Sequence, residues 1–410
     1  MRILVISSRI GKSPTEITSS FIFDEIYRLV KRGLEVHVVR SKVERDSVSY
    51  GIYFHGFEKL VDLRVFSGIL ESLSKYPPVS LLRPKFFQLY WENLYALNAI
   101  RVVKKCPVDI VHAHFAYPEG FVGVLVKNAI EKPLVITCHG YDINTVPEIG
   151  YGIRRRKEYD ALVRMALREA DAIISVSTRM KEKIVELGVN PGKVFVIPNA
   201  VDLELFRPPS KRDMEDIVNV RKQFGVDEDE FLLLNARHLY PVYGIQYLIY
   251  AMKIVTLRVR NVKLIVAGEG PLRKRLLKLT QKLGLEKYVK FVGEVPRTLM
   301  PKLMRASSLY VNTSLSDGSP PSLIEAIASG LPVVSFDVGG VNDIVINGFN
   351  GYLCSPRDSK TIANKILYLL ENPSEMKKMG SNSRKLAEER FDINRRIDKI
   401  VELYKKLIGK

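Results

Sequence analysis

Between two short apolar runs the chain reads Ser316-Asp317-Gly318-Ser319-Pro320-Pro321-Ser322-Leu323-Ile324-Glu325-Ala326. The runs are Leu309-Tyr310-Val311 and Leu331-Pro332-Val333-Val334, so the pattern predicts a strand, a loop, a helix and a second strand. In an α/β protein, ligands bind at such a loop because it follows the carboxyl end of a strand. Asp317 lies in the loop and Glu325 in the first turns of the helix. We expect both carboxylates to face a crevice, where charged acceptor oxygens suit a ligand rich in hydroxyl groups.

The ends of this helix can be predicted from the residue types. Ser319 is suited to cap the helix, Pro320 and Pro321 to occupy its first positions, and Gly330 to end it. Because a proline has no N–H group, this helix start offers few amides to a phosphate, chiefly those of Ser322 and Leu323.

The same alternation runs along the whole chain. Short β-branched runs alternate with stretches such as 20–32 and 159–169, which carry apolar residues at three- and four-residue spacing. This pattern predicts an α/β fold with doubly wound parallel sheets. The predicted strands are 3–6, 36–39, 110–113, 134–137, 172–176 and 194–197 in the first half, and 231–234, 262–267, 289–292, 309–312, 333–336 and 351–353 in the second.

A segment rich in proline and charge, 206–213, separates the two halves and reads as a linker. We therefore predict two domains, over residues 1–205 and 206–392, and a closing helix over about 393–410. Two such domains leave a cleft between the carboxyl edges of their sheets. A cleft of this kind favours a transferase with two substrates over a binding module with one.

Composition narrows the class of partner. The formal charge of +18 favours an anionic partner, which can be nucleic acid, an acidic membrane surface or a ligand that carries phosphate; a well-solvated surface is the alternative. Basic runs such as 154–157 lack the interleaved aromatic residues of nucleic-acid modules, so we expect no nucleic-acid partner. The run 154–157 can instead meet anionic lipid headgroups, although a solvated helix face is the plainer reading.

Cysteine usage and hydropathy indicate the compartment. Cys106, Cys138 and Cys354 lie far apart without metal-ligand spacing, which is typical of reduced thiols in a cytosolic protein. No run approaches the roughly 18 apolar residues of a membrane-spanning helix. We expect a soluble cytoplasmic protein that at most rests on the inner face of a membrane.

Two further positions carry chemistry at predicted strand ends. His139 follows the run 134–137 and precedes Gly140, where an imidazole can donate to a sugar hydroxyl or stabilise charge on a leaving group. Its plainer role is a histidine satisfied by backbone carbonyls. Arg237 leaves the first strand of the second half, where a guanidinium can hold a diphosphate, or can be an ordinary surface arginine.

Two other patterns are weaker. His112 and His114 alternate along a strand, but no carboxylate on a helix nearby accompanies them as a partner, so we expect a structural role and no metal site. The run Gly268-Glu269-Gly270-Pro271 lacks the third glycine of a dinucleotide fingerprint, and is weak evidence for NAD.

Taken together, these residues resemble glycosyltransferase family 4, whose members are retaining enzymes of the GT-B fold. The resemblance covers nearly the whole chain. It rests on Asp109-Ile110-Val111-His112-Ala113-His114, Thr137-Cys138-His139-Gly140-Tyr141-Asp142, Ile197-Pro198-Asn199-Ala200-Val201-Asp202, Gly268-Glu269-Gly270-Pro271-Leu272, Phe291-Val292-Gly293-Glu294-Val295, the segment 317–325 and Gly339-Gly340.

The resemblance implies a role for each candidate residue. Glu325 would bind the ribose hydroxyls of a nucleotide sugar, Asp317 the sugar hydroxyls, and Arg237 the diphosphate. His139 would lie near the exocyclic hydroxyl of the sugar, and Glu294 and Val295 near the base. Gly318, Ser322 and Leu323 complete the implied donor-binding set. The first domain would bind the acceptor, the second the donor, and the final helix would cross back to the first domain.

Several positions depart from the family pattern. The first carboxylate of the signature is usually glutamate, and here it is Asp317. The lysine that usually accompanies the arginine is replaced by Tyr243 before Gly244. A Gly-Gly pair near the amino terminus is replaced by Ile17-Thr18-Ser19-Ser20.

The sequence therefore predicts a retaining, hexosyltransferase-type enzyme. It would move a sugar from a nucleotide-diphosphate donor to a hydroxyl of a glycan, lipid or small molecule, with the donor as co-substrate and no metal or other cofactor. Three alternatives remain: a sugar-nucleotide epimerase, a phosphorylase, and a catalytically silent subunit that binds a sugar nucleotide. The base, sugar, acceptor and linkage are left open.

Overall fold

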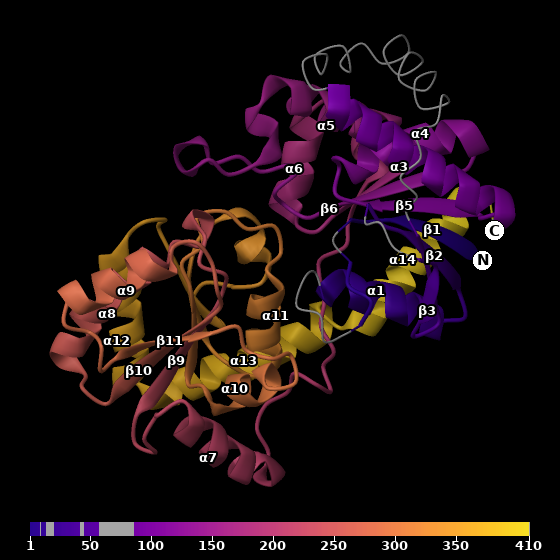
Figure 1. The fold of residues 1–410 in the computed structure, drawn as a ribbon. Coiled ribbons are helices and arrows are strands. Elements are labelled where there is room, and N and C mark those ends of the chain that lie inside the picture. The colour runs from indigo at the N-terminus through magenta and orange to yellow at the C-terminus, as the bar shows by residue number, and fades with distance from the viewer. Residues whose placement is uncertain (9, 14–19, 42–44, 57–85, 410) are drawn as a thin grey trace. The chain divides into compact units, whose positions relative to one another are not determined.

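The computed structural model describes residues 1–8, 10–13, 20–41, 45–56 and 86–409, and the chain divides into two compact units (Figure 1). The amino-terminal unit comprises Met1–Pro198 and Asn394–Lys410, and the carboxy-terminal unit comprises Asn199–Ile393. Of the loop Ile17-Thr18-Ser19-Ser20, the first three residues lie outside the described part of the chain.

The amino-terminal unit is built on an eight-stranded sheet of order β3-β4-β2-β1-β5-β6-β7-β8. Its strands are β1 (Arg2–Ile6), β2 (Glu35–Val39), β3 (Ser47–Ser49), β4 (Ile52–His55), β5 (Ile110–His114), β6 (Leu134–Cys138), β7 (Ala172–Ser175) and β8 (Val194–Val196). All neighbours pair in parallel except β3 and β4. The central strands β1, β5 and β6 are buried on both faces, which explains why most of their residues are apolar.

Helices cover both faces of this sheet. Three of them, α3 (Phe86–Lys105), α4 (Glu119–Ile130) and α5 (Lys157–Glu169), pack in sequence on one face and enclose a large apolar core. Two others, α1 (Ser20–Lys31) and α14 (Ile393–Leu407), lie side by side, joined by an ion pair between Arg32 and Asp398 at 2.9 Å. A further described helix of this unit is α6 (Thr178–Glu186).

The carboxy-terminal unit has a six-stranded sheet of order β11-β10-β9-β12-β13-β14 in which every pair is parallel. Its strands are β9 (Phe231–Ala236), β10 (Val262–Ala267), β11 (Val289–Gly293), β12 (Leu309–Asn312), β13 (Val333–Phe336) and β14 (Gly351–Cys354). The strand order reverses between β10 and β12 on either side of β9, and such a reversal marks the place where ligands bind in open α/β sheets.

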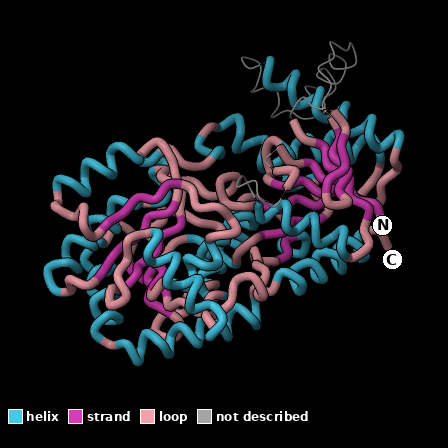
Figure 2. The backbone as a smooth tube through the Cα atoms, turned by 60° about the horizontal axis from the view of Figure 1, so that its bottom comes forward, coloured by secondary structure: helices cyan, strands magenta, loops and turns pink. Residues whose placement is uncertain are grey.

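Seven α-helices accompany this sheet in the described chain: α7 (Met214–Gln223), α8 (Ile245–Arg258), α9 (Arg273–Lys282), α10 (Met300–Ala306), α11 (Pro321–Ala328), α12 (Ser359–Glu371) and α13 (Pro373–Arg390). One group, α8 with α9 and α12, packs together, and a second group consists of α7, α10, α11 and α13. Figure 2 shows the strands of each unit enclosed by helices. The predicted class, two doubly wound parallel α/β sheets, is confirmed.

The twelve predicted strands are all present, each within two residues of its expected ends. The described chain has two further strands, β3 and β4, which are short and carry exposed residues such as Val48 and Tyr53.

The chain divides before Asn199 rather than at the predicted linker, 206–213. Val201 pairs with the backbone of the carboxy-terminal unit, donating to the carbonyl of Phe391 at 3.0 Å and accepting from the amide of Ile393 at 3.1 Å. The guanidinium of Arg384 donates to the carbonyls of Leu203 and Phe206. Residues 199–206 are therefore held as part of that unit.

The segment 206–213 is folded rather than a free linker. Arg207 pairs with Asp213 at 2.8 Å, and the carboxylate of Asp213 also accepts the amide and hydroxyl of Ser210. These contacts form a capping box before α7.

Two other expectations concern the cysteines and the membrane. Cys138 and Cys354 are buried thiols, whereas Cys106 is partly exposed. Among the described helices, none combines the length and apolar character needed to pass through a lipid bilayer.

Candidate active site

The residues predicted to bind the donor gather at one edge of the carboxy-terminal sheet. Because its strands are all parallel, their carboxyl ends meet at this edge. The structure places there Arg237 after β9, Glu294 and Val295 after β11, Asp317 and Gly318 in the loop after β12, and Ser322, Leu323 and Glu325 on α11.

Arg237 and Asp317 form a buried ion pair at the centre of this edge. The Nη2 atom of Arg237 lies 2.5 Å from Oδ2 of Asp317, and the two side chains are only 10% and 11% exposed. Burial opposes the charge on Arg237, but Asp317 outweighs it and raises the arginine pKa. Burial also raises the pKa of Asp317, and Arg237 and the hydroxyl of Ser314 offset part of that rise. Arg237 therefore remains a cation with its charge directed at Asp317.

Two tyrosines and a serine hold the guanidinium in place. The Cζ atom of Arg237 lies 4.2 Å from the ring centre of Tyr243, a cation–π contact at the position where the family pattern has lysine. The hydroxyl of Tyr310 donates to Oγ of Ser322 at 2.8 Å, and Nη1 of Arg237 approaches the same oxygen at 3.4 Å. The aromatic ring of Tyr243 therefore takes the place of the second positive charge that the family pattern would put in this site.

Tyr310 was not among the predicted site residues. A phenol inside the fully buried strand β12 needs a hydrogen-bond partner, and this need was the signal available in the sequence. Burial raises the pKa of Tyr310 to about 12, so its hydroxyl stays protonated and remains a donor.

Two glycines allow the backbone to close around the ion pair. A Cβ atom on Gly339 would lie 1.8 Å from the carbonyl oxygen of Asp317, and one on Gly268 would lie 2.3 Å from the carbonyl oxygen of Arg237. The left-handed φ of Gly339, +51°, adds a second reason for glycine there. The pair Gly339-Gly340 also donates to the loop, since the amide of Gly340 bonds the carbonyl of Asp317 at 3.2 Å.

The start of α11 differs from the prediction in two respects. Pro320 is the N-cap residue, and Ser319 makes no capping bond; its hydroxyl is buried without a hydrogen-bond partner among the described residues. The amide of Leu323 donates to the carbonyl of Pro320 at 3.1 Å, so this N–H is not directed at a ligand. Gly330 follows the end of the helix with a φ of +78°, as predicted.

The remaining candidate residues occupy more open positions. Glu294 is exposed and Val295 is half-buried just beyond the edge strand β11. Glu325 is half-buried on α11, one turn after Ser322 and therefore on the same side of the helix.

His139 belongs to a buried cluster in the amino-terminal unit. Its Nε2 atom lies 3.1 Å from Nδ1 of His114, and the two rings stack. The rings of Phe21 and Phe115 pack against it, with centroids at 5.2 and 4.7 Å. A neighbouring imidazole and two aromatic rings thus fix its orientation, rather than backbone carbonyls alone.

The premise that no carboxylate lies near His112 and His114 is wrong. Glu25 on α1 approaches Nε2 of His114 at 3.6 Å and Nδ1 of His112 at 4.0 Å. These two histidines are fully buried, and burial lowers both of their pKa values, that of His114 to about 4. Glu25 is distant in sequence, so only the packing of α1 on β5 brings it to them.

The basic run 154–157 is partly neutralised inside the amino-terminal unit. Arg154 pairs with Asp160 at 2.6 Å and donates to the carbonyl of Ile143, and its side chain is 15% exposed. This arginine is therefore a structural residue, which weakens the case for the run as a lipid-binding surface.

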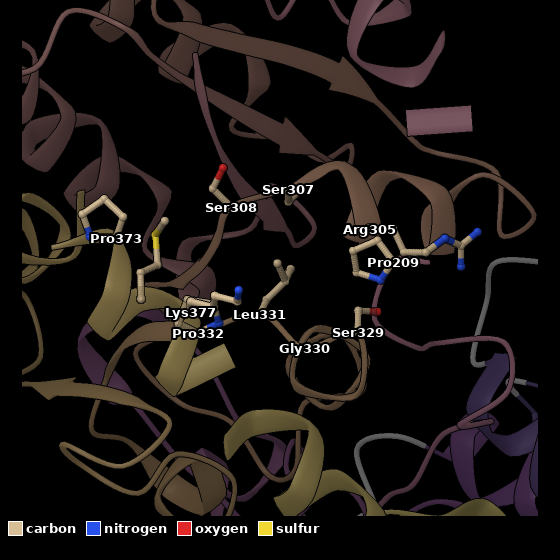
Figure 3. A pocket seen from close by; sticks show the side chains of 11 residues that line it. Pro209, Arg305, Ser307, Ser308, Ser329, Gly330, Leu331, Pro332, Pro373 and Lys377 are labelled. Atoms are coloured by element: carbon tan, nitrogen blue, oxygen red, sulfur yellow. The ribbon is translucent and has the colours of Figure 1, made fainter. Parts of the chain in front are cut away.

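Figure 3 shows a pocket in the carboxy-terminal unit, and its lining includes neither Arg237 nor Asp317. Its lining includes Ser307 and Ser308, which precede β12, and Leu331 and Pro332, which precede β13. These residues mark the amino edge of the sheet, opposite to the predicted site, and none of the candidate residues lines the pocket.

Two family models match the chain in succession. The model of Glycosyltransferase Family 4 matches residues 19–205, and the model of Glycosyl transferases group 1 matches residues 216–386. A curated relative, N-acetyl-alpha-D-glucosaminyl L-malate synthase of Bacillus anthracis, is 27% identical over 382 residues, which cover 92% of this chain and 89% of that protein.

Solved structures show the same architecture. Sucrose-phosphate synthase from Thermosynechococcus elongatus has a TM-score of 0.81 at 19% identity, with 100% of this chain and 99% of that chain covered. The Anabaena protein HepE in complex with UDP-glucose has a TM-score of 0.77 at 22% identity, with 99% of this chain and 100% of that chain covered.

The fold, with two parallel-sheet α/β domains, is of the GT-B class, and the solved structures that resemble it are GT-B glycosyltransferases. The chain belongs to glycosyltransferase family 4, and it is a glycosyltransferase.

Proposed function

We propose that this protein is a retaining glycosyltransferase of the hexosyltransferase type. It would move a sugar from a nucleotide-diphosphate donor to a hydroxyl of a glycan, a lipid or a small molecule. The observation that carries the proposal is the buried guanidinium of Arg237 at the carboxyl edge of β9, paired with the carboxylate of Asp317. A second carboxylate, Glu325, lies on α11, which follows the loop of Asp317.

The geometry suggests how the donor would be held. The diphosphate would accept from Arg237 and compete with Asp317 for its charge, so that the Asp317 carboxylate turns to the sugar hydroxyls. Glu325, one helical turn beyond Ser322, would bind the ribose, and Glu294 with Val295 would lie along the base. Gly318, Ser322 and Leu323 would line the donor at the start of α11, with the Ser322 hydroxyl rather than the Leu323 amide as the polar group.

The proposed reaction keeps the configuration of the sugar. The bond from the anomeric carbon to the diphosphate oxygen breaks, a bond to the acceptor oxygen forms on the same face, and the acceptor proton passes to the departing phosphate. The protein must then stabilise the leaving diphosphate and a cation-like ring, which are tasks for Arg237 and for Asp317 with His139. No metal takes part in this scheme.

Relatives support the choice of donors to test. The Bacillus anthracis relative is named for transfer of an N-acetylglucosaminyl group to malate, and HepE was solved with UDP-glucose. We therefore place UDP-sugars first, followed by GDP- and ADP-sugars. Contact with an anionic membrane stays a prediction.

A thermal-shift panel of these donors tests the proposal, because a ligand that binds only the folded state raises the melting temperature. We expect one donor class to raise it, and Glu325→Ala to abolish that shift with the fold intact. Glu371→Ala is the matched control. Glu371 is the last residue of α12, a helix that follows β14 and runs back toward the amino edge of the sheet, and its side chain forms an exposed ion pair with Arg258. A donor shift that survives in Glu325→Ala would remove this residue from the site.

Turnover separates the proposal from its alternatives. A transferase consumes donor only when an acceptor is present and releases the nucleoside diphosphate. An epimerase converts the donor without an acceptor, a phosphorylase requires inorganic phosphate, and a silent subunit binds donor without consuming it. Conversion of the donor without an acceptor, a requirement for inorganic phosphate, or binding without turnover for any acceptor would contradict the proposed transfer.

A further inference from the structure

Three side chains lie in a line from the interior of the amino-terminal unit to His139. Glu25 on α1 is 2% exposed, and its Oε1 atom lies 3.6 Å from Nε2 of His114 at the end of β5. The other ring nitrogen of His114, Nδ1, lies 3.1 Å from Nε2 of His139. Oε1 of Glu25 and Nε2 of His114 have no hydrogen-bond partner among the described residues, so each is the polar group to which the other is directed.

Glu25 is ionised in this position. Burial alone would raise its pKa, but the guanidinium of Arg396 and the two histidines outweigh burial and lower the pKa to about 2. Arg396 on α14 donates to Oε2 at 2.6 and 3.1 Å, and also to the carbonyl of Ile197. Oε2 is therefore occupied by Arg396, and Oε1 is the oxygen that faces His114.

The cluster is not arranged as a cation site, although ligand atoms of Glu25, His112 and His114 lie within 4.8 Å of one another. A metal ion there would meet the positive guanidinium of Arg396. Both ring nitrogens of His112 are also engaged, Nδ1 with the hydroxyl of Tyr404 at 2.5 Å and Nε2 with that of Thr137 at 2.7 Å. The groups instead form a series in which the Glu25 carboxylate makes an electrostatic contact with His114 at 3.6 Å, and His114 shares a hydrogen bond with His139 at 3.1 Å.

The direction of this series follows from its buried end. The negative charge of Glu25, 3.6 Å away, attracts an N–H group and repels a lone pair, so Nε2 of His114 carries the hydrogen that faces Glu25. Because burial keeps His114 neutral at pH 7, its Nδ1 carries a lone pair and must accept from Nε2–H of His139. The partner of one ring nitrogen sets which tautomer an imidazole adopts.

We propose that Glu25 is a positioning residue that acts through His114 to hold His139 in the tautomer protonated at Nε2. In the neutral imidazole, Nδ1 of His139, which is a buried atom in the free protein, is then the nitrogen with the lone pair. A substrate hydroxyl that reaches this atom would meet an acceptor rather than a donor. Phe21 and Glu25 lie four residues apart on α1, so one helix both packs against the His139 ring and orders its protons. The tautomer is a property of the free protein, whereas its use on a sugar hydroxyl rests on the proposed function.

The variant Glu25→Gln tests the tautomer directly. The glutamine carbonyl must face Arg396, so its NH2 group faces Nε2 of His114 and donates to it. The hydrogen of His114 then moves to Nδ1, which forces Nε2 of His139 to accept and its Nδ1 to carry the hydrogen. Replacing one oxygen by NH2 thus inverts both tautomers without a change of side-chain shape.

The measurement is nitrogen NMR of the full chain with labelled histidine, which contains six imidazoles. Single His→Gln variants assign the signals. In the native protein we expect His139 to be protonated at Nε2, and in Glu25→Gln at Nδ1. A native His139 protonated at Nδ1, or an unchanged pattern in Glu25→Gln, would overturn the proposal.

The chain supplies a matched control. Glu35, His37 and His55 form a second carboxylate–imidazole–imidazole series on β2 and β4, with distances of 3.0 and 2.9 Å. Glu35→Gln makes the same chemical change there, so it should alter the signals of His37 or His55 and leave His139 and turnover unchanged. A change at His139 in this control would mean that the Glu25 effect is not local, and would count against the proposal.

Turnover tests the functional half. With donor and acceptor, Glu25→Gln should lower kcat by about tenfold to a hundredfold, the usual effect of losing a residue that orients a working imidazole, with KM for the donor little changed. Glu25→Asp, which keeps an acceptor-only carboxylate, should restore most of kcat and the native tautomer. An inverted tautomer with unchanged kcat would refute the positioning role. Absence of turnover in the native protein would count against the proposed function, and NMR would still decide the tautomer.

Discussion

The ion pair between Arg237 and Asp317 allows a quantitative test of the candidate site. Arg237→Met removes the guanidinium and leaves a carboxylate whose side chain is 11% exposed. Removing one partner of a buried pair costs about 3–5 kcal/mol. Asp317 can limit this cost by taking up a proton, which at pH 7 and from an ordinary pKa of 3.8 costs about 4 kcal/mol, at 1.36 kcal/mol per unit.

We therefore expect a loss of about 3–4 kcal/mol in the stability of the carboxy-terminal unit, since protonation provides the upper limit. For a unit of this size, 1 kcal/mol shifts the melting temperature by about 2–4 °C, so the predicted fall is about 6–16 °C by scanning calorimetry. The double variant Arg237→Met/Asp317→Asn, which has no buried charge, should regain most of the loss and still bind no donor.

The stability of Arg237→Met should depend on pH. In Arg237→Met the folded-state pKa of Asp317 is raised above its unfolded value, so the neutral carboxyl is tolerated below pH 3.8 and the penalty grows as the pH rises. The deficit relative to the double variant should shrink toward pH 4. Arg258→Met is the control, because Arg258 and its partner Glu371 are 62% and 43% exposed and such pairs contribute little. A melting temperature for Arg237→Met equal to that of the control, or a double variant no more stable than the single one, would refute this reasoning.

Two other predictions concern a buried carboxyl and a glycine. Burial raises the pKa of Glu92 on α3 to about 8, so the folded protein must hold this carboxyl protonated at pH 7. Because pH 7 lies 2.5 pH units above the ordinary pKa of 4.5, this protonation costs up to about 3 kcal/mol. Glu92→Gln removes that cost and keeps the acceptor for Tyr117, so it should stabilise the protein by up to this amount. A raised folded-state pKa costs stability only above the unfolded value, so the gain should vanish near pH 4.5; melting curves between pH 4 and 8 measure it, and a gain independent of pH would contradict it. Gly339→Ala should lower the melting temperature and abolish the donor-induced shift, because its Cβ would meet the Asp317 carbonyl at 1.8 Å. Gly348→Ala is its control, with a φ of +78° but nothing within 4 Å, and equal effects of the two would argue against a clash at Asp317.

Most strands were predictable because their residues are largely buried, so they appear as short apolar runs such as 3–6 in β1 or 172–174 in β7. The short strands β3 and β4 were not predicted, since they have only three and four residues and include exposed side chains. Gly330 was found because a left-handed residue after a helix strongly favours glycine. The prediction that Ser319 caps α11 was wrong, because its hydroxyl is buried in the loop and makes no bond to the helix start. Residue preference at a helix cap does not determine where a side chain points inside a packed loop.

The domain boundary shows the limit of composition. Proline and charge at 206–213 are typical of a linker, yet Asp213 is nearly buried and bonded to Arg207 and Ser210. The division before Asn199 depends on backbone bonds from Val201 to Phe391 and Ile393, which are almost two hundred residues away in the chain. Such distant pairing leaves no local mark in the sequence.

The sequence by itself determined the α/β class, the strands, and which residues stand at the carboxyl end of each strand in the second half. These features follow from local apolar patterns and from the rule that parallel strands end at a common edge. Only the tertiary structure decided which charges meet. Arg237 pairs with Asp317, and Glu25 contacts His114 while it pairs with Arg396. These contacts form because separate elements pack together and exclude water from the groups between them. Charges taken out of water must find a partner, and the partner is whatever packing places within reach.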